Sequence, residues 1–117
     1  VAVVKGVSDF GFLERVKEIS PETVTIGRWA DPQWEAIDAQ GDPAERATDY
    51  MAEHMPHWEP HRAYVDYWEV LNEPDPPTPA QHAWLAQFFI AAMNIAEANG
   101  YKLALFSYST GVPEWYE

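Results

Sequence analysis

The chain has 117 residues, enough for one domain with a modest hydrophobic core. Its 19 acidic and 7 basic residues give a net charge of −12, which disfavours nucleic acids and anionic membranes as partners. The absence of cysteine excludes disulfides and thiolate metal sites, and no apolar run reaches the roughly 18 residues of a membrane span. A hydrophobic share of 47% with six tryptophans argues against disorder.

Short apolar stretches alternate with helical patterns from the start of the chain. Residues 1–7 and 23–29 are rich in β-branched side chains and predict strands. Between them, residues 10–19 carry apolar side chains at helical spacing, and Asp9 is the expected cap of that helix. A long polar connection over residues 31–42 follows the second strand.

Two further helices begin with a capping residue followed by proline. Asp42-Pro43 starts the first, which Pro56 and Pro60 are expected to break or kink. Thr78-Pro79 starts the second and longest, which should end where Gly100 offers a left-handed stop. The remaining strands are predicted over residues 64–72 and 102–108.

The resulting order, β-α-β-α-β-α-β, predicts an α/β fold. Strands that alternate with helices are joined by right-handed crossovers and form a parallel sheet. We therefore expect one domain over residues 1–117, with the carboxyl ends of all four strands at one edge of the sheet.

The third predicted strand ends in a chemically distinctive sequence. Residues 68–75 read Trp-Glu-Val-Leu-Asn-Glu-Pro-Asp. Pro74 cannot continue a central strand, because it has no N–H to donate, and it keeps Glu73 out of the α region. The sequence therefore predicts a carboxylate at the carboxyl end of a strand, where proteins with parallel sheets place reactive groups.

This sequence resembles the fourth-strand motif of the retaining glycoside hydrolases of clan A, and is closest to the family 39-like and family 5-like (β/α)8 barrels. The resemblance implies that Glu73 is the general acid/base and that Asn72 holds the sugar hydroxyl next to the anomeric carbon. It also implies that the chain holds strands two to five, about half of a TIM barrel, since a whole barrel takes about 250 residues.

The chain departs from the resembled families in its second carboxylate. Their nucleophile lies on strand seven, beyond Glu117. Glu114 is the one substitute that we name within this sequence. The nucleophile therefore comes from Glu114, from another segment or subunit, or the chain is not catalytic.

The carboxyl ends of the four predicted strands collect further candidate ligand contacts. Trp29 and Trp115 stand at strand ends and could stack on a sugar ring, whereas Trp68 and Trp84 are expected in the core. The full set of residues expected at this edge is Asp9, Arg28, Trp29, Asp31, Asn72, Glu73, Asp75, Ser107, Ser109 and Glu114.

Period two along the third strand places Glu69 on the same side as Glu73, facing the interior of a barrel. A buried carboxylate needs a cation, and Arg28 on the neighbouring strand is the natural one. Arg28 is thus either a structural partner of Glu69 or a ligand contact. On the same reasoning, Ile26 and Leu71 would face water in half a barrel.

Three histidines, His54, His57 and His61, have a spacing that suggests a metal site. Pro56 and Pro60 interrupt a common helical face, which favours a solvated surface instead. No phosphate loop, dinucleotide fingerprint or serine elbow is present, so no cofactor is expected.

Three interpretations remain open. The first is a glycosidase segment with a carbohydrate substrate and Glu73 as acid/base. The second is a non-catalytic carbohydrate-binding or scaffold half-barrel, and the third is a fragment that functions only after assembly. Because four strands cannot close a barrel and leave two free edges, we expect a homo-oligomer or a complementing barrel half as partner.

Overall fold

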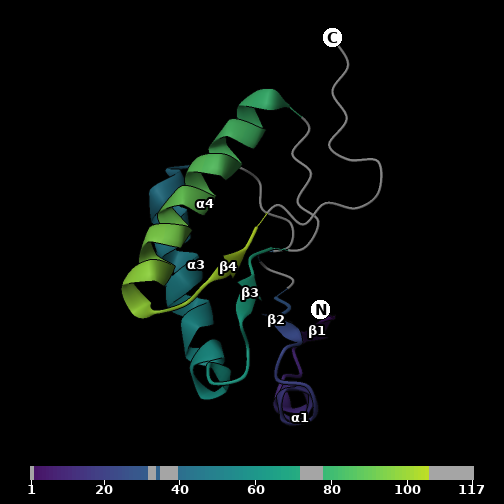
Figure 1. The fold of residues 1–117 in the computed structure, drawn as a ribbon. Coiled ribbons are helices and arrows are strands. Elements are labelled where there is room, and N and C mark those ends of the chain that lie inside the picture. The colour runs from purple at the N-terminus through teal and green to yellow at the C-terminus, as the bar shows by residue number, and fades with distance from the viewer. Residues whose placement is uncertain (1, 32–33, 35–39, 72–77, 106–117) are drawn as a thin grey trace.

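The structure is a computed structural model, and it describes residues 2–31, 34, 40–71 and 78–105. The described chain forms a four-stranded parallel sheet with the strand order β1-β2-β3-β4 (Figure 1). The strands are β1 (Val3–Val7), β2 (Val24–Arg28), β3 (Tyr67–Glu69) and β4 (Leu103–Ala104). The predicted α/β class and parallel sheet are confirmed, and neighbouring strands in the sheet are neighbours along the chain.

The helices begin and end close to their predicted positions. They are α1 (Gly11–Ile19), α3 (Pro43–Trp58) and α4 (Pro79–Asn99). The caps of the two longer helices are as expected, because Asp42 accepts from the backbone N–H of Glu45 (3.1 Å) and Thr78 from that of Gln81 (3.2 Å). Gly100 ends α4 in the left-handed conformation, at φ 80°. None of the helices in the described ranges is both long and apolar enough to cross a membrane.

Two local predictions about helix ends are wrong. Asp9 does not cap α1, whose N-cap is Phe10 with no side-chain hydrogen bond. Pro56 does not break α3, which continues to Trp58. The helix does end before Pro60, which lies in a 3-10 turn over Glu59–His61, so the expected break is confirmed at Pro60 and wrong at Pro56. Since Pro56 lies only two residues before the end of the helix, its missing N–H removes a hydrogen bond from a turn that is already ending.

The strands are shorter than predicted, most of all the third. Hydrogen-bonded pairing of β3 covers Tyr67–Glu69, whereas residues 64–72 were expected to pair. Tyr64 lies in a turn instead, and Leu71 has left the extended conformation. Glu73 therefore follows the last residue of β3 by four positions rather than one, and it lies outside the described residues.

The two faces of the sheet differ. Trp68 of β3 is buried and stacks on Trp58 of α3, with ring centroids 5.1 Å apart and planes 8° apart. Phe10 meets the same ring edge-on at 5.0 Å, so this face of the sheet packs against the helices. Gly27 of β2 lies beneath the indole, where an added Cβ would come within 2.7 Å of it. The core thus forms between the sheet and the helices that flank it in Figure 1.

Within each strand, the residues that alternate with Trp68 and Gly27 point to the other face of the sheet. Val3, Val7 and Tyr67 are exposed there, and Ile26 is half-buried. Leu71, in contrast, is only 4% exposed, so its expected contact with water is wrong. The more open face fits an incomplete barrel, and the half-barrel itself remains a prediction.

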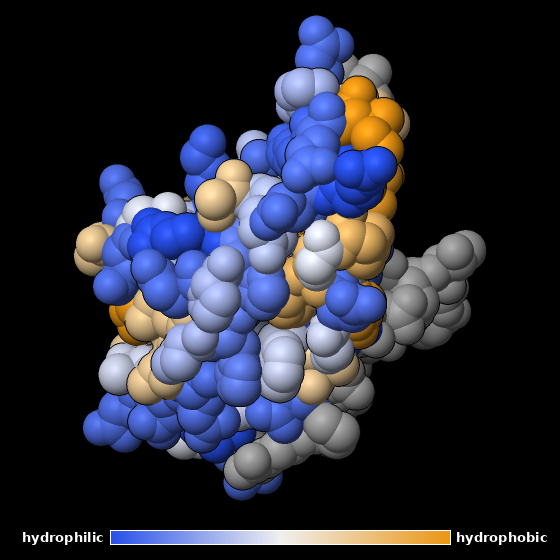
Figure 2. Space-filling view, turned by 90° about the horizontal axis from the view of Figure 1, so that it is seen from below, coloured by the Kyte–Doolittle hydropathy of each residue, from blue (hydrophilic) through white to orange (hydrophobic). Residues whose placement is uncertain are grey.

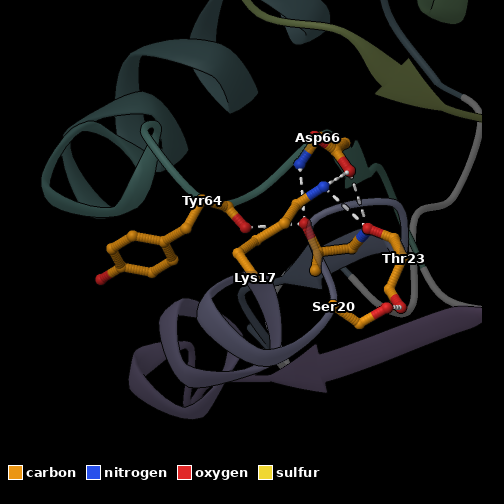
Figure 3. A network of polar contacts seen from close by, with 6 residues as sticks. Lys17, Ser20, Thr23, Tyr64 and Asp66 are labelled. Atoms are coloured by element: carbon orange, nitrogen blue, oxygen red, sulfur yellow. Dashed lines mark hydrogen bonds and ion pairs between the residues drawn. The ribbon is translucent and has the colours of Figure 1, made fainter.

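A hydrogen-bond network fastens the amino-terminal edge of the sheet (Figure 3). Nζ of Lys17 donates to Asp66 (2.6 Å) and to the backbone oxygen of Thr23 (2.7 Å). Asp66 also accepts from the backbone N–H of Thr25 (3.0 Å), whose hydroxyl donates to the carbonyl of Tyr64 (2.7 Å). The network joins α1, β2 and the segment before β3, and it lies at the edge that serves stability in parallel barrels.

We expect Asp66→Asn to destabilise the protein by about 1–2 kcal/mol at neutral pH, because it removes a charge-assisted bond to a partly exposed lysine. Burial raises the pKa of Asp66, but the bonds from Lys17 and Thr25 outweigh it and hold the pKa below its usual value. A lowered carboxyl pKa stabilises the fold above the unfolded-state pKa of about 4, and the effect is lost as pH falls through the folded-state pKa.

Urea unfolding of both proteins at neutral pH and at about pH 3 measures this difference. The difference in unfolding free energy between the unaltered protein and Asp66→Asn should be smaller at about pH 3 than at neutral pH. Glu18→Gln is the matched control, since among the described residues Glu18 pairs with Arg15 alone, at 3.2 Å on the surface of α1. A gap that stays constant across this range would show that the Asp66 carboxylate contributes nothing through its charge.

Candidate functional site

The site is built at the carboxyl-terminal edge of the sheet. Of the predicted ligand contacts, Arg28 and Trp29 are described, and they stand at the end of β2, as expected. Asn72, Glu73 and Asp75 lie outside the described residues. Glu114 and Trp115 do as well, as do Ser107 and Ser109, so the structure does not test their predicted roles.

The backbone takes an unusual conformation at two places on this edge. Ser8 follows β1 with φ 56°, and Leu71 follows β3 with φ 64°. A left-handed conformation costs a residue with a side chain about 1–2 kcal/mol, and such strain gathers at functional sites. Leu71 is also buried, so the chain is redirected at a packed position immediately before Asn72.

Ser8 ties the end of β1 to the end of β2. Its backbone N–H donates to the carbonyl of Arg28 (2.8 Å), and its hydroxyl accepts from the N–H of Ala30 (2.9 Å). These bonds hold the segment that carries Arg28 and Trp29. The strained turn therefore has a structural role in positioning this part of the edge.

Glu69 is the centre of an ion-pair cluster on the open face of the sheet. Its side chain is only 7% exposed, and its Oε1 lies 3.1 Å from Nε of Arg28. This confirms the predicted partnership of Glu69 with Arg28. Lys5 of β1 joins them, with Nζ 2.8 and 2.9 Å from the two carboxylate oxygens. Lys5 was missed, although period two along β1 places it on the face that Glu69 occupies.

Two tryptophan side chains near this edge are fixed by contacts with residues of α3. Trp29 is half-buried and stacks on His57 of α3, with centroids 3.9 Å apart and planes 8° apart. Trp34 is buried, and its Nε1 donates to Glu53 (2.6 Å). The guanidinium of Arg46 lies over the same indole, 4.7 Å from the ring centroid. Trp34 is therefore closed off by its neighbours, and of these two rings it is the half-buried Trp29 that is available to a flat apolar surface.

A small cavity lies between these groups. It is lined by Arg28, Trp29, Asp31, Trp34, Tyr50, His54 and Leu71. Burial raises the pKa of Tyr50, while a hydrogen bond from the backbone of Leu71 acts in the opposite direction. The cavity thus joins β2, α3 and the strained residue that precedes the Asn-Glu-Pro sequence.

The three histidines have separate environments. His54 is 1% exposed and stacks on Tyr50 (3.8 Å, 9°), so the predicted solvated surface is wrong for this residue. It lies one helical turn after Tyr50, on the face of α3 that packs into the core. His57 is exposed but covers Trp29, and His61 is half-buried against Phe10. In the described part of the chain, no group of three or more His, Cys, Asp or Glu side chains is arranged to hold a metal.

The remaining tryptophan predictions are confirmed to different degrees. Trp68 is a core residue with 1% exposure. Trp84 is half-buried, stacks on Phe88 at 5.7 Å and donates to the carbonyl of Gly41 (2.9 Å). Both therefore pack within the fold.

A larger hollow, of about 360 Å³, opens at the opposite, amino-terminal edge. Asp66, Tyr67 and Lys102 are among its lining residues. It is far wider than the cavity beside His54, but it lies at the edge that carries the Asp66 network and not at the strand ends that lead to Glu73. Its position makes it a weaker candidate for the functional site.

Comparisons of the chain with protein-family models, with characterised proteins and with solved structures give no match.

Proposed function

We propose that the chain is a (β/α)-barrel segment of a retaining glycoside hydrolase, with Glu73 as the general acid/base. The observation that carries this proposal is the sequence Asn72-Glu73-Pro74, which follows the third strand of a parallel sheet. The consecutive strand order supports it, because an open doubly wound sheet reverses its order and a barrel does not.

In this mechanism the carboxyl group of Glu73 donates its proton to the leaving-group oxygen and later activates the water that releases the product. A second carboxylate, about 5–5.5 Å away, attacks the anomeric carbon. The resemblance to clan A assigns that nucleophile to strand seven, and Glu114 is the substitute within this sequence. We propose Asn72, Arg28, Trp29, Asp75, Trp115 and Glu114 as the substrate contacts.

The geometry of the described contacts supports a neutral sugar as ligand. Arg28 is already paired with Glu69, so it is better suited to orienting a hydroxyl group than to neutralising an anion. Trp29 is held in place by His57 at the same edge. The acidic composition of the chain also disfavours a negatively charged substrate.

The alternative is a non-catalytic carbohydrate-binding or scaffold half-barrel that acts after assembly with a second copy or a complementing half. The exposed apolar residues Val3, Val7, Phe12 and Ile19 of β1 and α1 favour assembly. Figure 2 shows hydrophobic surface along one side of an otherwise mostly hydrophilic view. Within the described residues, β1 pairs with β2 alone and β4 with β3 alone, so both strands can accept a further one.

Saccharide titration followed by amide NMR tests the proposed site. We expect neutral oligosaccharides to shift the amides of Arg28, Trp29 and Leu71, and to leave those of Asp66 and Lys102 at the opposite edge unchanged. Trp29→Ala should weaken binding about tenfold, the size of a lost ring-stacking contact. Tyr67→Ala is the matched control, because Tyr67 is an exposed aromatic residue on β3 away from the cavity.

Shifts confined to Asp66 and Lys102 would place the ligand at the wrong edge. The absence of shifts across neutral, branched and linear saccharides would overturn a carbohydrate function for this chain.

A further inference from the structure

The longest helix, α4, is apolar on two opposite sides. Glu97 is the one charged residue among its 21, in a chain with a net charge of −12. Phe88 is buried and meets Tyr50 of α3, with ring centroids 5.8 Å apart. Ile90 and Met93 lie on the opposite side of the helix, because successive residues are about 100° apart around its axis. They are 52% and 49% exposed, and a helix that is apolar all round is normally covered all round, so this second side indicates a further contact.

A groove lies beside this exposed side of α4. Its volume is about 440 Å³, and it opens between α4 and β4, which Figure 1 shows next to one another. Met93 and Ala96 line it from the helix, and Leu103 and Leu105 line it from β4 and the residue after the strand. Because β4 is the last strand of the described sheet, the groove lies at the outer margin of the sheet. It can receive apolar side chains that stand out from another helix.

The charged residues of the groove have opposite signs. Glu97 and Lys102 both line it, and both are exposed. Within the described part of the chain, neither belongs to an ion pair. In a symmetric dimer, Glu97 of each copy can therefore meet Lys102 of the partner subunit, so the groove is complementary to itself. Two copies with a net charge of −12 repel each other through most of their surface, whereas this face carries no net charge.

We propose that Ile90, Met93 and the groove beside them form the interface of a symmetric dimer of this chain. Around a two-fold axis, the exposed side chains of one α4 enter the groove of the other, and both copies use the same surface. The inference goes beyond the proposed carbohydrate function and does not depend on it. It assigns the contact to α4 rather than to the exposed apolar residues of β1 and α1. A helix of a different protein is the competing occupant of the groove.

Sedimentation equilibrium over a range of micromolar concentrations tests the dimer. We expect the unaltered protein to approach twice the 13.3 kDa mass of one chain. Met93→Glu should raise the dissociation constant about thirtyfold or more, because it places a charge in an apolar contact at the centre of the interface. Ile19→Glu is the matched control, since it adds the same charge at an exposed apolar residue of α1 and should leave the constant unchanged.

An exchange of the two charges tests the pairing across the two-fold axis. Glu97→Lys and Lys102→Glu should each raise the dissociation constant about tenfold, because each pair occurs twice in the dimer. The double variant should return to within about threefold of the unaltered protein. Glu97→Lys makes the chain less negative, so general repulsion alone would tighten the dimer. Weakening by this variant and rescue by the second substitution therefore identify a direct pair.

Three results would overturn the inference. The first is the mass of one chain at every concentration, which leaves a helix of another protein as the occupant of the groove. The second is a dimer that Ile19→Glu dissociates and Met93→Glu leaves intact. The third comes from a mixture of ¹³C-labelled and unlabelled protein, in which we expect an intermolecular NOE from the Met93 methyl group to Leu103 or Leu105. Its absence from a dimeric sample overturns the contact, and this measurement decides on the unaltered protein should a variant fail to fold.

Discussion

Glu73→Gln is expected to lower glycoside hydrolysis about 10³-fold in an assembly that supplies both carboxylates. A general acid/base contributes typically 10²–10⁴-fold, because it donates a proton to the leaving group in the transition state. Glutamine keeps the size and hydrogen bonding of the side chain but cannot transfer a proton. The 117-residue chain alone should hydrolyse aryl glycosides poorly, since the resembled families place their nucleophile on a later strand.

The choice of leaving group makes this measurement specific. An aryl glycoside with a very acidic phenol needs little protonation, so its first step should be much less affected by Glu73→Gln than that of an alkyl glycoside. Glu22→Gln is the control, because Glu22 is exposed in the turn between α1 and β2, at the amino-terminal edge. Full activity of Glu73→Gln on both substrates would contradict the role. Saccharide binding without hydrolysis in any assembly would favour the non-catalytic half-barrel.

Features that depend on local rules were predicted well. Capping oxygens at Asp42 and Thr78 and the left-handed Gly100 mark helix ends through interactions within a few residues. The pairing of Glu69 with Arg28 was also predicted. It follows from period two and from the cost of an isolated buried charge, and neither requires knowledge of the distant fold.

The cavity could not be predicted from the sequence in the same way. Trp34 stands in a polar stretch that resembles a connection, and its burial depends on Glu53 and Arg46 of α3. The spacing of the three histidines predicted a surface position for His54, whereas it lies on the core face of α3, one turn after Tyr50 and stacked on it. Nothing in the sequence predicted the left-handed conformation of Leu71, since glycine and asparagine are the residues usually found in that conformation.

Trp68→Ala is expected to have the largest effect on stability, about 3–5 kcal/mol. The indole is 1% exposed and contacts Trp58 and Phe10, so its removal leaves a large cavity between the sheet and the helices. The total unfolding free energy of a domain of this size is about 5–15 kcal/mol. A loss of this size therefore removes a large part of the stability and lowers the thermal midpoint. Urea unfolding at 25 °C, with far-ultraviolet circular dichroism as the readout, measures the change.

Gly27 provides an internal test of the same contact. A Cβ at this position would lie 2.7 Å from the Trp68 indole, so Gly27→Ala should cost about 1–3 kcal/mol in the presence of Trp68. In a Trp68→Ala background the closest obstacle is gone and the Phe10 ring, 3.3 Å from the added Cβ, is the next one, so the added methyl group should cost much less. The double variant should therefore be more stable than the sum of the two single losses predicts. Trp84→Ala is the control, because the atoms nearest to an added Cβ at Gly27 belong to Trp68 and Phe10, so the effect of Trp84→Ala should add to that of Gly27→Ala. Additive losses for Gly27 and Trp68 would show that the indole does not pack over β2, and the core between the sheet and α3 would then differ from the one described.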